Sequence, residues 1–172
     1  MKNIIKYSLA VATLLVLNAS PAWAAGSVKT TSDVKDSSDI VVGSSTLRRT
    51  SQGVSMTIHT TGIPAGHAVT VWVCIFRDDG NFDCLRAAGH VVGADGELNA
   101  GGAVKVGDTS ESISPAFGAD GLGLLDPFGD FVVIVVRDHG PAIPGQIPDQ
   151  IHSYQPECVT CTDSQVSFHP AP

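Results

Sequence analysis

The sequence predicts an all-β fold, a two-sheet sandwich of immunoglobulin-like architecture with about seven short antiparallel strands. Three observations support this prediction. Short runs of alternating or β-branched apolar residues recur along the chain, glycine-rich turns separate them, and no stretch after residue 24 shows sustained helical periodicity. A small closed barrel would produce the same pattern and is the alternative architecture.

The individual strands follow from the two patterns that β-structure imposes on a sequence. Val54, Met56 and Ile58 alternate with polar residues, as expected for a strand with one buried face. The runs 69–76 and 131–137 are apolar on both faces, which is typical of central strands. Strands are expected at 46–49, 54–60, 68–76, 85–92, 98–106, 131–137 and 165–169.

Three segments lack these patterns. Residues 25–38 are rich in Ser, Thr, Asp and Lys, and we expect them to form a flexible N-terminal arm, or alternatively a weak edge strand, before a single domain, 39–172. Residues 107–130, rich in Gly, Ser, Asp and Pro, are expected to cross between the sheets. Residues 138–155 are expected to form a loop that several prolines hold in place.

The first 24 residues predict a cleavable signal peptide. Lys2 and Lys6 supply positive charge, residues 7–17 are apolar, and Ala22 and Ala24 provide the small residues required before cleavage. The apolar run is too short to cross a bilayer. We therefore expect a periplasmic or secreted protein that is not inserted in a membrane after cleavage.

Charge limits the partners that this chain can bind. The formal net charge is −7, and removal of residues 1–24, which contain two lysines and no acidic residue, takes it to −9. An acidic surface argues against nucleic acid and anionic lipid, because both require clustered Lys and Arg.

The four cysteines all follow the predicted cleavage site, which indicates two disulfides formed in an oxidising compartment. Three connectivities exist, and we favour the local one. Cys74 and Cys84 flank Asp78-Asp79-Gly80, a hairpin loop that would place them opposite each other. Cys158 and Cys161 would then bond to each other. A redox centre is the alternative for this Cys-x-x-Cys pair, but the strand-to-helix setting of such centres is missing.

Histidines suggest a metal site, with copper or zinc as the metal and no other cofactor expected. The candidate ligands are His59, His67, His90 and His139, although no His-x-His or His-x-x-x-His spacing pairs them. The densest reactive group is Arg137-Asp138-His139, where a strand ends. These three side chains could bind an anion, orient an imidazole and act as acid or base, with His90 completing the site. The structural alternative is that they pair with neighbours and hold the proline-rich loop.

Recognised catalytic signatures are absent from the sequence. It contains no Gly-x-Ser-x-Gly elbow, no phosphate-binding glycine loop before a helix and no His-Glu-x-x-His. We therefore expect an exported, non-catalytic protein with a binding or structural role. The alternative is a copper, zinc or acid–base site built from His90, Arg137, Asp138 and His139.

Three segments, 56–72, 88–93 and 137–145, resemble a family of exported bacterial proteins of uncharacterised function, and the last (RDHGPAIPG) is the most specific. The resemblance implies an exported β-rich domain and brings no activity. The Gly62-Ile63-Pro64-Ala65-Gly66 turn and its flanking strands are also loosely similar to copper–zinc superoxide dismutase and chordin-type sandwiches. The paired copper ligands of the dismutases are missing here, since Val71-Trp72-Val73 stands in their place.

Overall fold

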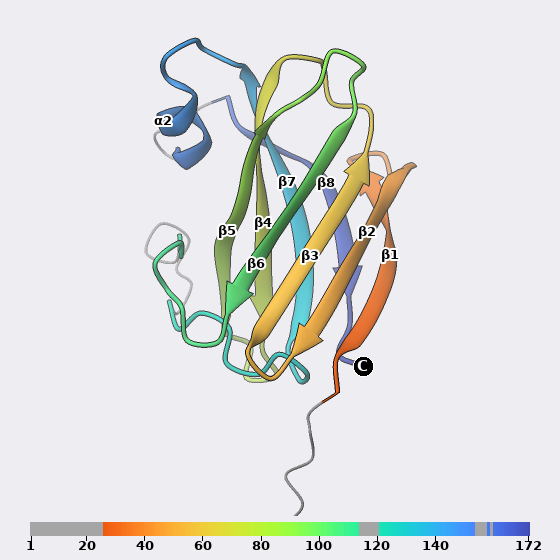
Figure 1. Ribbon diagram of the computed structural model, residues 1–172, viewed down its shortest axis with the longest axis vertical. Coiled ribbons are helices and arrows are strands. Elements are labelled where there is room, and N and C mark those ends of the chain that lie inside the picture. Colours follow the sequence, from red (N-terminus) through yellow and green to blue (C-terminus); the bar gives the residue numbers. More distant parts are fainter. Residues whose placement is uncertain (1–25, 114–120, 154–157, 159) are drawn as a thin grey trace, which may run out of the picture.

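The structure, a computed structural model, describes residues 26–113, 121–153, 158 and 160–172 (Figure 1). The predicted signal segment, residues 1–24, lies outside the described residues. Strands dominate the described chain, so the predicted all-β class is confirmed. The strands are β1 (Val28–Asp36), β2 (Val41–Thr50), β3 (Gly53–Thr60), β4 (His67–Phe76), β5 (Phe82–Val91), β6 (Leu98–Lys105), β7 (Phe131–Pro141) and β8 (Thr162–His169), with helix α2 (Ile147–His152) between β7 and β8.

The strands form one continuous antiparallel sheet in the order β5-β4-β7-β8-β1-β2-β3-β6, which curls nearly into a barrel (Figure 1). This single sheet replaces the two separate sheets expected for a sandwich. Alternating apolar residues show which face of a strand is buried, and that face is the same in a barrel and in a sandwich. The sequence pattern therefore could not separate the two architectures.

The two edge strands, β5 and β6, approach each other where the barrel closes. Gly102 on β6 faces the main-chain carbonyl of Ala87 on β5, and a Cβ atom at position 102 would collide with it. Glycine at this position permits the close approach of the two backbones.

The segment expected to be a flexible arm or a weak edge strand forms β1, which is an internal strand between β2 and β8. It pairs with β2 along its length and with β8 at Lys35 and Asp36. Its burial alternates as in any half-buried strand, but only Val34 is fully buried. Thr30 and Ser32, at two of the other inward positions, are small and polar, which is why the composition favoured an arm over a strand.

The barrel interior is filled by an apolar cluster to which β1 to β7 contribute. A smaller cluster of Trp72, Cys74, Cys84, Ile113 and Val133 covers the outer face of β4, β5 and β7. The strands β4 and β7 are thus buried on both faces, as their continuous apolar runs predicted.

Two connections depart from the sequence expectations. In the described residues between β6 and β7, Val106 is bridged to Leu124 and Ser112 to Leu85 of the same single sheet, rather than to a second sheet. The segment expected to be a loop after residue 137 contains the end of β7 and the helix α2. This helix has only six residues and buries none of them, so it has no apolar stripe that a sequence pattern could reveal.

Both disulfides join cysteines that are close in sequence. Cys74 on β4 and Cys84 on β5 are direct partners in the strand register, with Cα atoms 4.0 Å apart. Cys158 and Cys161 form the second bridge, ahead of β8. This is the local pairing favoured from the hairpin argument.

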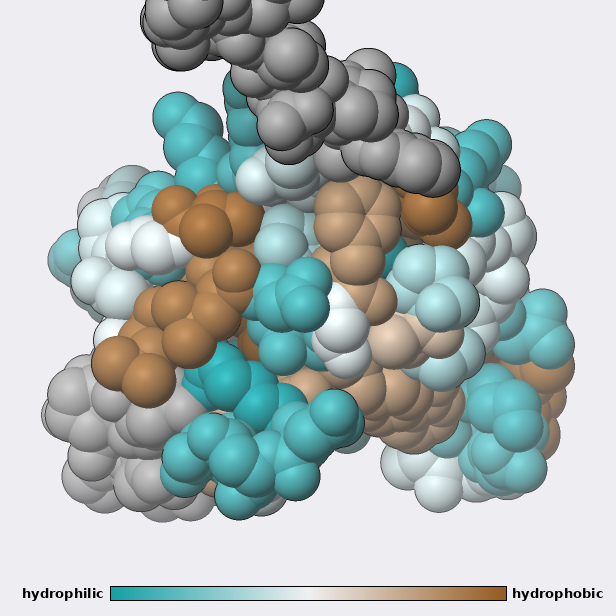
Figure 2. Space-filling view, turned by 90° about the horizontal axis from the view of Figure 1, so that it is seen from below, coloured by the Kyte–Doolittle hydropathy of each residue, from teal (hydrophilic) through white to brown (hydrophobic). Residues whose placement is uncertain are grey.

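Four phenylalanines form a row across the outer face of four neighbouring strands. Phe82, Phe76, Phe131 and Phe168 belong to β5, β4, β7 and β8, and adjacent ring centroids lie 5.7 to 6.3 Å apart. Viewed from below, hydrophobic side chains are exposed at this end of the molecule (Figure 2). The candidate site lies at the opposite, upper end of the barrel.

Candidate functional site

The reactive residues predicted at the end of β7 lie on opposite faces of that strand. Asp138 lines a pocket at the upper end of the barrel. Arg137 stacks on Trp72 of the outer cluster, and His139 contacts Thr70 and the Cys158–Cys161 disulfide. Because successive side chains of a strand point to opposite faces, three consecutive residues cannot converge on one substrate atom.

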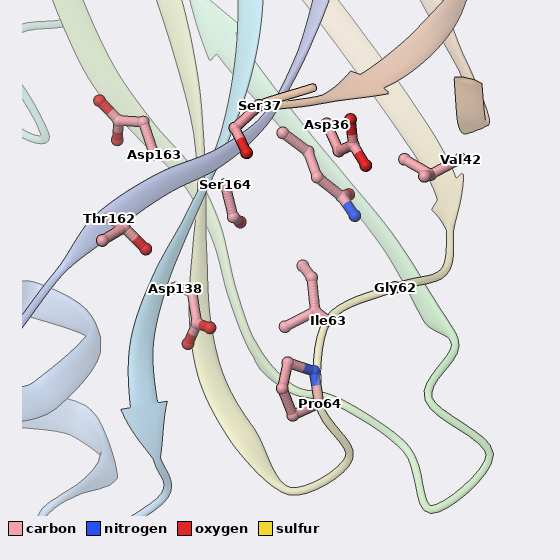
Figure 3. Close-up of a pocket in the computed structure, with 11 residues that line it drawn as sticks. Asp36, Ser37, Val42, Gly62, Ile63, Pro64, Asp138, Thr162, Asp163 and Ser164 are labelled. Atoms are coloured by element: carbon pink, nitrogen blue, oxygen red, sulfur yellow. The ribbon is translucent and has the colours of Figure 1, made fainter. Parts of the chain in front are cut away.

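The pocket on the inner side has a volume of about 430 Å³ and opens where the β1–β2 and β3–β4 turns meet β7 and β8 (Figure 3). Its charged lining residues are the carboxylates Asp36, Asp138 and Asp163, and its lining contains no basic side chain. The rest of the lining comprises Ser37, Val42, Gly62, Ile63, Pro64, Thr162, Ser164 and Gln165. The pocket thus combines negative charge and hydroxyl groups with a small apolar wall.

Fixed hydrogen bonds orient the carboxylate of Asp138. His67 Nδ1 lies 3.0 Å from each of its oxygens, and the main-chain N–H of Gly140 donates to Oδ1 at 2.7 Å. Both side chains are largely buried, with 20% of His67 and 15% of Asp138 exposed. The structure therefore brings together two candidate residues, His67 and Asp138, that the sequence argument had placed in separate groups.

The other two carboxylates are also anchored. Asp163, at the pocket rim, accepts from Nε and one terminal nitrogen of Arg137 at 2.7 and 2.9 Å. Asp36 Oδ1 accepts from the main-chain N–H groups of Ser38 and Ile40, which fixes the β1–β2 turn. Hydrogen bonds to other parts of the protein therefore orient all three lining carboxylates.

On the outer side, His139 is buried against the second disulfide. Its Nδ1 atom lies 3.0 Å from Sγ of Cys161 and 3.8 Å from Sγ of Cys158, and its Nε2 atom lies 2.8 Å from Oγ1 of Thr70. The three residues are each at most 8% exposed. Their donor atoms lie within 4.8 Å of one another, as the ligands of a metal ion would.

Burial keeps His139 neutral at physiological pH. Desolvation, and then the positive charge of Arg137, lowers the pKa of His139 to about 4. Thr70 Oγ1 donates to the main-chain carbonyl of Ile151 at 2.7 Å, so the same hydroxyl must accept the hydrogen from Nε2 of His139. The lone pair of Nδ1 then faces the two sulfur atoms.

The remaining histidine candidates do not join either group. His59 is exposed on β3, where its Nδ1 atom lies 2.5 Å from Oδ1 of Asn99. His90 is exposed on β5 and is separated from Asp138 by the width of β4, because both residues pair with Val69. The predicted set of His90, Arg137, Asp138 and His139 is therefore not assembled as one site.

Sequence reasoning missed a buried polar network inside the barrel. Ser45 Oγ lies 2.8 Å from Nε2 of His169 and 2.5 Å from Oγ of Ser167, and Thr30 Oγ1 lies 2.9 Å from Nδ1 of His169. Ser45, Ser167 and His169 are at most 1% exposed, so no substrate reaches this Ser–His pair. The only sign of this network in the sequence is the alternation of β8, which places Ser167 and His169 on the same inward face.

Comparison with known proteins finds no matching family model, no matching curated protein and no matching solved structure. Within the described part of the chain, every helix is too short or too polar to cross a bilayer.

Proposed function

We propose that this protein is an exported, non-catalytic binding protein that holds a small organic cation, such as a primary amine, in the pocket at the upper end of the barrel. The observation that carries the proposal is the lining of this pocket, in which the charged groups are carboxylates and the neighbouring wall is apolar (Figure 3). An ammonium group would lie near Asp36 and Asp138, and a short hydrocarbon chain would lie against Val42, Ile63 and Pro64.

The size and rigidity of the pocket support a binding role. A volume of about 430 Å³ is within the range of small-molecule sites. Asp138 is held by His67 and Gly140, and Asp36 by the turn that it caps, so little side-chain ordering is needed on binding. Preformed acceptors of this kind favour cations over anions and over neutral molecules of the same shape.

Two further observations support a role without turnover. Ser164, a hydroxyl in the lining, donates to the main-chain carbonyl of Val136 at 3.1 Å, and none of the described residues acts as a base toward it. The strand alternation directs His139 and Arg137 away from Asp138, which removes the acid–base set that the sequence suggested.

The exported location is part of the same proposal. The signal-like segment 1–24 directs export, and two disulfides are typical of proteins that fold in the periplasm or outside the cell. Detection of the processed chain, beginning near residue 25, in a periplasmic or culture fraction would test this part.

Titration calorimetry with butylamine, butanol and butyrate tests the ligand class, because the three probes share one hydrocarbon chain and differ in charge. We expect butylamine to bind and the other two to bind at least several-fold more weakly, with an affinity for the amine that falls as salt is added. Equal binding of butanol, or no binding of the amine, would contradict the proposal.

Matched variants locate the binding site. Asp36→Asn and Asp138→Asn keep an acceptor oxygen for their hydrogen bonds and remove one negative charge each, so each should weaken butylamine binding by roughly fivefold. Asp149→Asn, on the exposed surface of α2, makes the same charge change outside the pocket and should leave the affinity unchanged. Equal effects of all three variants would indicate attraction by net charge alone.

A further inference from the structure

A second site lies on the opposite face of β7, at the Cys158–Cys161 disulfide. We infer that reduction of this disulfide creates a buried binding site for a soft metal ion, Cu(I), with Nδ1 of His139 and the sulfurs of Cys158 and Cys161 as ligands. This inference goes beyond the amine pocket and does not depend on it, because the two sites share no residue.

The orientation of the imidazole is the first support. The hydroxyl of Thr70 donates its hydrogen to the carbonyl of Ile151. Toward His139 the same hydroxyl can therefore only accept, from Nε2–H. Ser153 Oγ, 3.4 Å from Nδ1, donates to the carbonyl of Gln150 at 2.6 Å. Among the described residues, no N–H or O–H group is therefore left to donate to Nδ1. A buried nitrogen lone pair, on a side chain 4% exposed, is aimed at the two sulfurs.

The distances fit a shared metal ion. With bonds of roughly 2.0 Å to nitrogen and 2.3 Å to sulfur, the nitrogen and sulfur ligands of one ion lie roughly 3.5 Å apart. The two nitrogen–sulfur distances here are 3.0 and 3.8 Å. Opening of the disulfide is the one rearrangement required, since the sulfurs must move apart to bind an ion between them.

The chemistry of the ligands selects the metal. Thiolates favour Cu(I) and Zn²⁺ over hard cations, and imidazole suits both metals. Zinc requires a fourth ligand, which is water in open sites, whereas Cu(I) accepts a trigonal set. All three ligand residues are buried and leave little access for water, so the site favours Cu(I).

The reaction balances with a thiol reductant. Two thiol groups reduce the Cys158–Cys161 disulfide to two cysteines and are themselves oxidised to a disulfide. Binding of Cu(I) then releases the two cysteine protons to solvent. The oxidised chain has no thiolate and should not bind the ion.

The experiment compares the same full chain in two states. Protein reduced with a phosphine and desalted without oxygen is titrated with Cu(I) against a chromophoric Cu(I) chelator, and the oxidised protein is treated identically. We expect one tightly held Cu(I) per reduced chain, an ultraviolet sulfur-to-copper charge-transfer band and no retention by the oxidised chain. Lack of retention by the reduced chain, or preferential retention of zinc over Cu(I), would overturn the assignment.

Variants separate this site from the other cysteine pair. The variant Cys74→Ala/Cys84→Ala should still bind one Cu(I) ion. The variant Cys158→Ala/Cys161→Ala should not bind the ion, because the dithiol that it retains has no histidine beside it among the described residues. His139→Asn keeps both cysteines and should weaken binding at least tenfold. Thr70→Val, which removes the positioning contact to Nε2, should weaken binding roughly tenfold and shift the charge-transfer band. Unchanged affinity in His139→Asn would rule out the histidine as a ligand.

Discussion

The guanidinium of Arg49 donates to the main-chain carbonyl of His169 at 2.8 Å and so ties β2 to the end of β8. The same side chain donates to the carbonyls of Pro127 and Asp130, at 2.6 and 2.9 Å, and it is fully buried. One arginine therefore joins the second strand, the last strand and the loop before β7 at the lower end of the barrel.

Arg49→Met should lower the free energy of unfolding by about 3 kcal/mol, because several buried carbonyls lose a charged donor. Urea titration at neutral pH measures this change. The adjacent Arg48 is an ideal control, since it is exposed and contacts only Ser27 among the described side chains at 3.2 Å. Arg48→Met should change stability by less than about 0.5 kcal/mol. A similar loss in the two variants would contradict the structural role of Arg49.

The pH dependence of stability should report on the buried His169. Burial, and then the charge of Arg49, lowers the pKa of His169 to about 4 in the folded protein, below its ordinary value of 6.5. The unfolded chain therefore takes up the proton first, so this contribution to stability is complete above about pH 6.5 and is lost as the pH falls toward 4. The loss is on the order of 3 kcal/mol. His139, whose pKa is lowered in the same way, adds a second loss of this kind.

Urea titrations at pH 7 and pH 4.5 test this linkage in the wild type and in His169→Gln. The variant will be less stable at both pH values, but its further loss on acidification should be smaller than that of the wild type by about 2 kcal/mol. His152→Gln, at an exposed position on α2, should behave like the wild type. If the stability of the wild type and of His169→Gln depended on pH in the same way, His169 would not be a source of the acid destabilisation.

Closure of the barrel should depend on Gly102. Gly102→Ala would push β6 away from the carbonyl of Ala87 and should destabilise the fold by about 1–3 kcal/mol. The neighbouring Gly101→Ala makes the same substitution on the other face of β6, where a Cβ atom would lie 3.4 Å from the carbonyl oxygen of Met56. Chemical denaturation should show little effect of Gly101→Ala. Equal destabilisation by Gly102→Ala and Gly101→Ala would mean that a change in backbone entropy, and not the close approach of β5 and β6, explains the loss.

The two disulfides should contribute unequally to stability. Loss of loop-closure entropy in the unfolded chain predicts about 3 kcal/mol for Cys74–Cys84, with a sequence separation of 10, and about 2 kcal/mol for Cys158–Cys161, with a separation of 3. Unfolding of the two double alanine variants without reductant measures both values. A larger loss for Cys158→Ala/Cys161→Ala would show that the second bridge also holds tertiary contacts around His139.

Much of the strand content could be predicted because burial of one or both faces leaves a direct mark on the sequence. The alternation at Val54, Met56 and Ile58 located β3, and the continuous apolar runs located β4 and β7. The internal position of β1 was not predicted, and a flexible arm was preferred to a strand, because its inward residues Thr30 and Ser32 are polar and resemble the residues of an unstructured arm. Whether the strands form one sheet or two depends on hydrogen bonds between distant segments, to which side-chain periodicity is insensitive.

Some features of the candidate site could likewise be predicted from the sequence, and others depended on the tertiary structure. The sequence alone determined that Arg137, Asp138 and His139 end a buried strand and that four cysteines suit two short bridges. Only the tertiary structure decided that Asp138 faces His67 while His139 faces Thr70 and Cys161, since these partners are 69 to 71 and 22 residues away along the chain. The physical reason is that residue type and spacing control local conformation, whereas the pairing of strands selects which distant side chains meet.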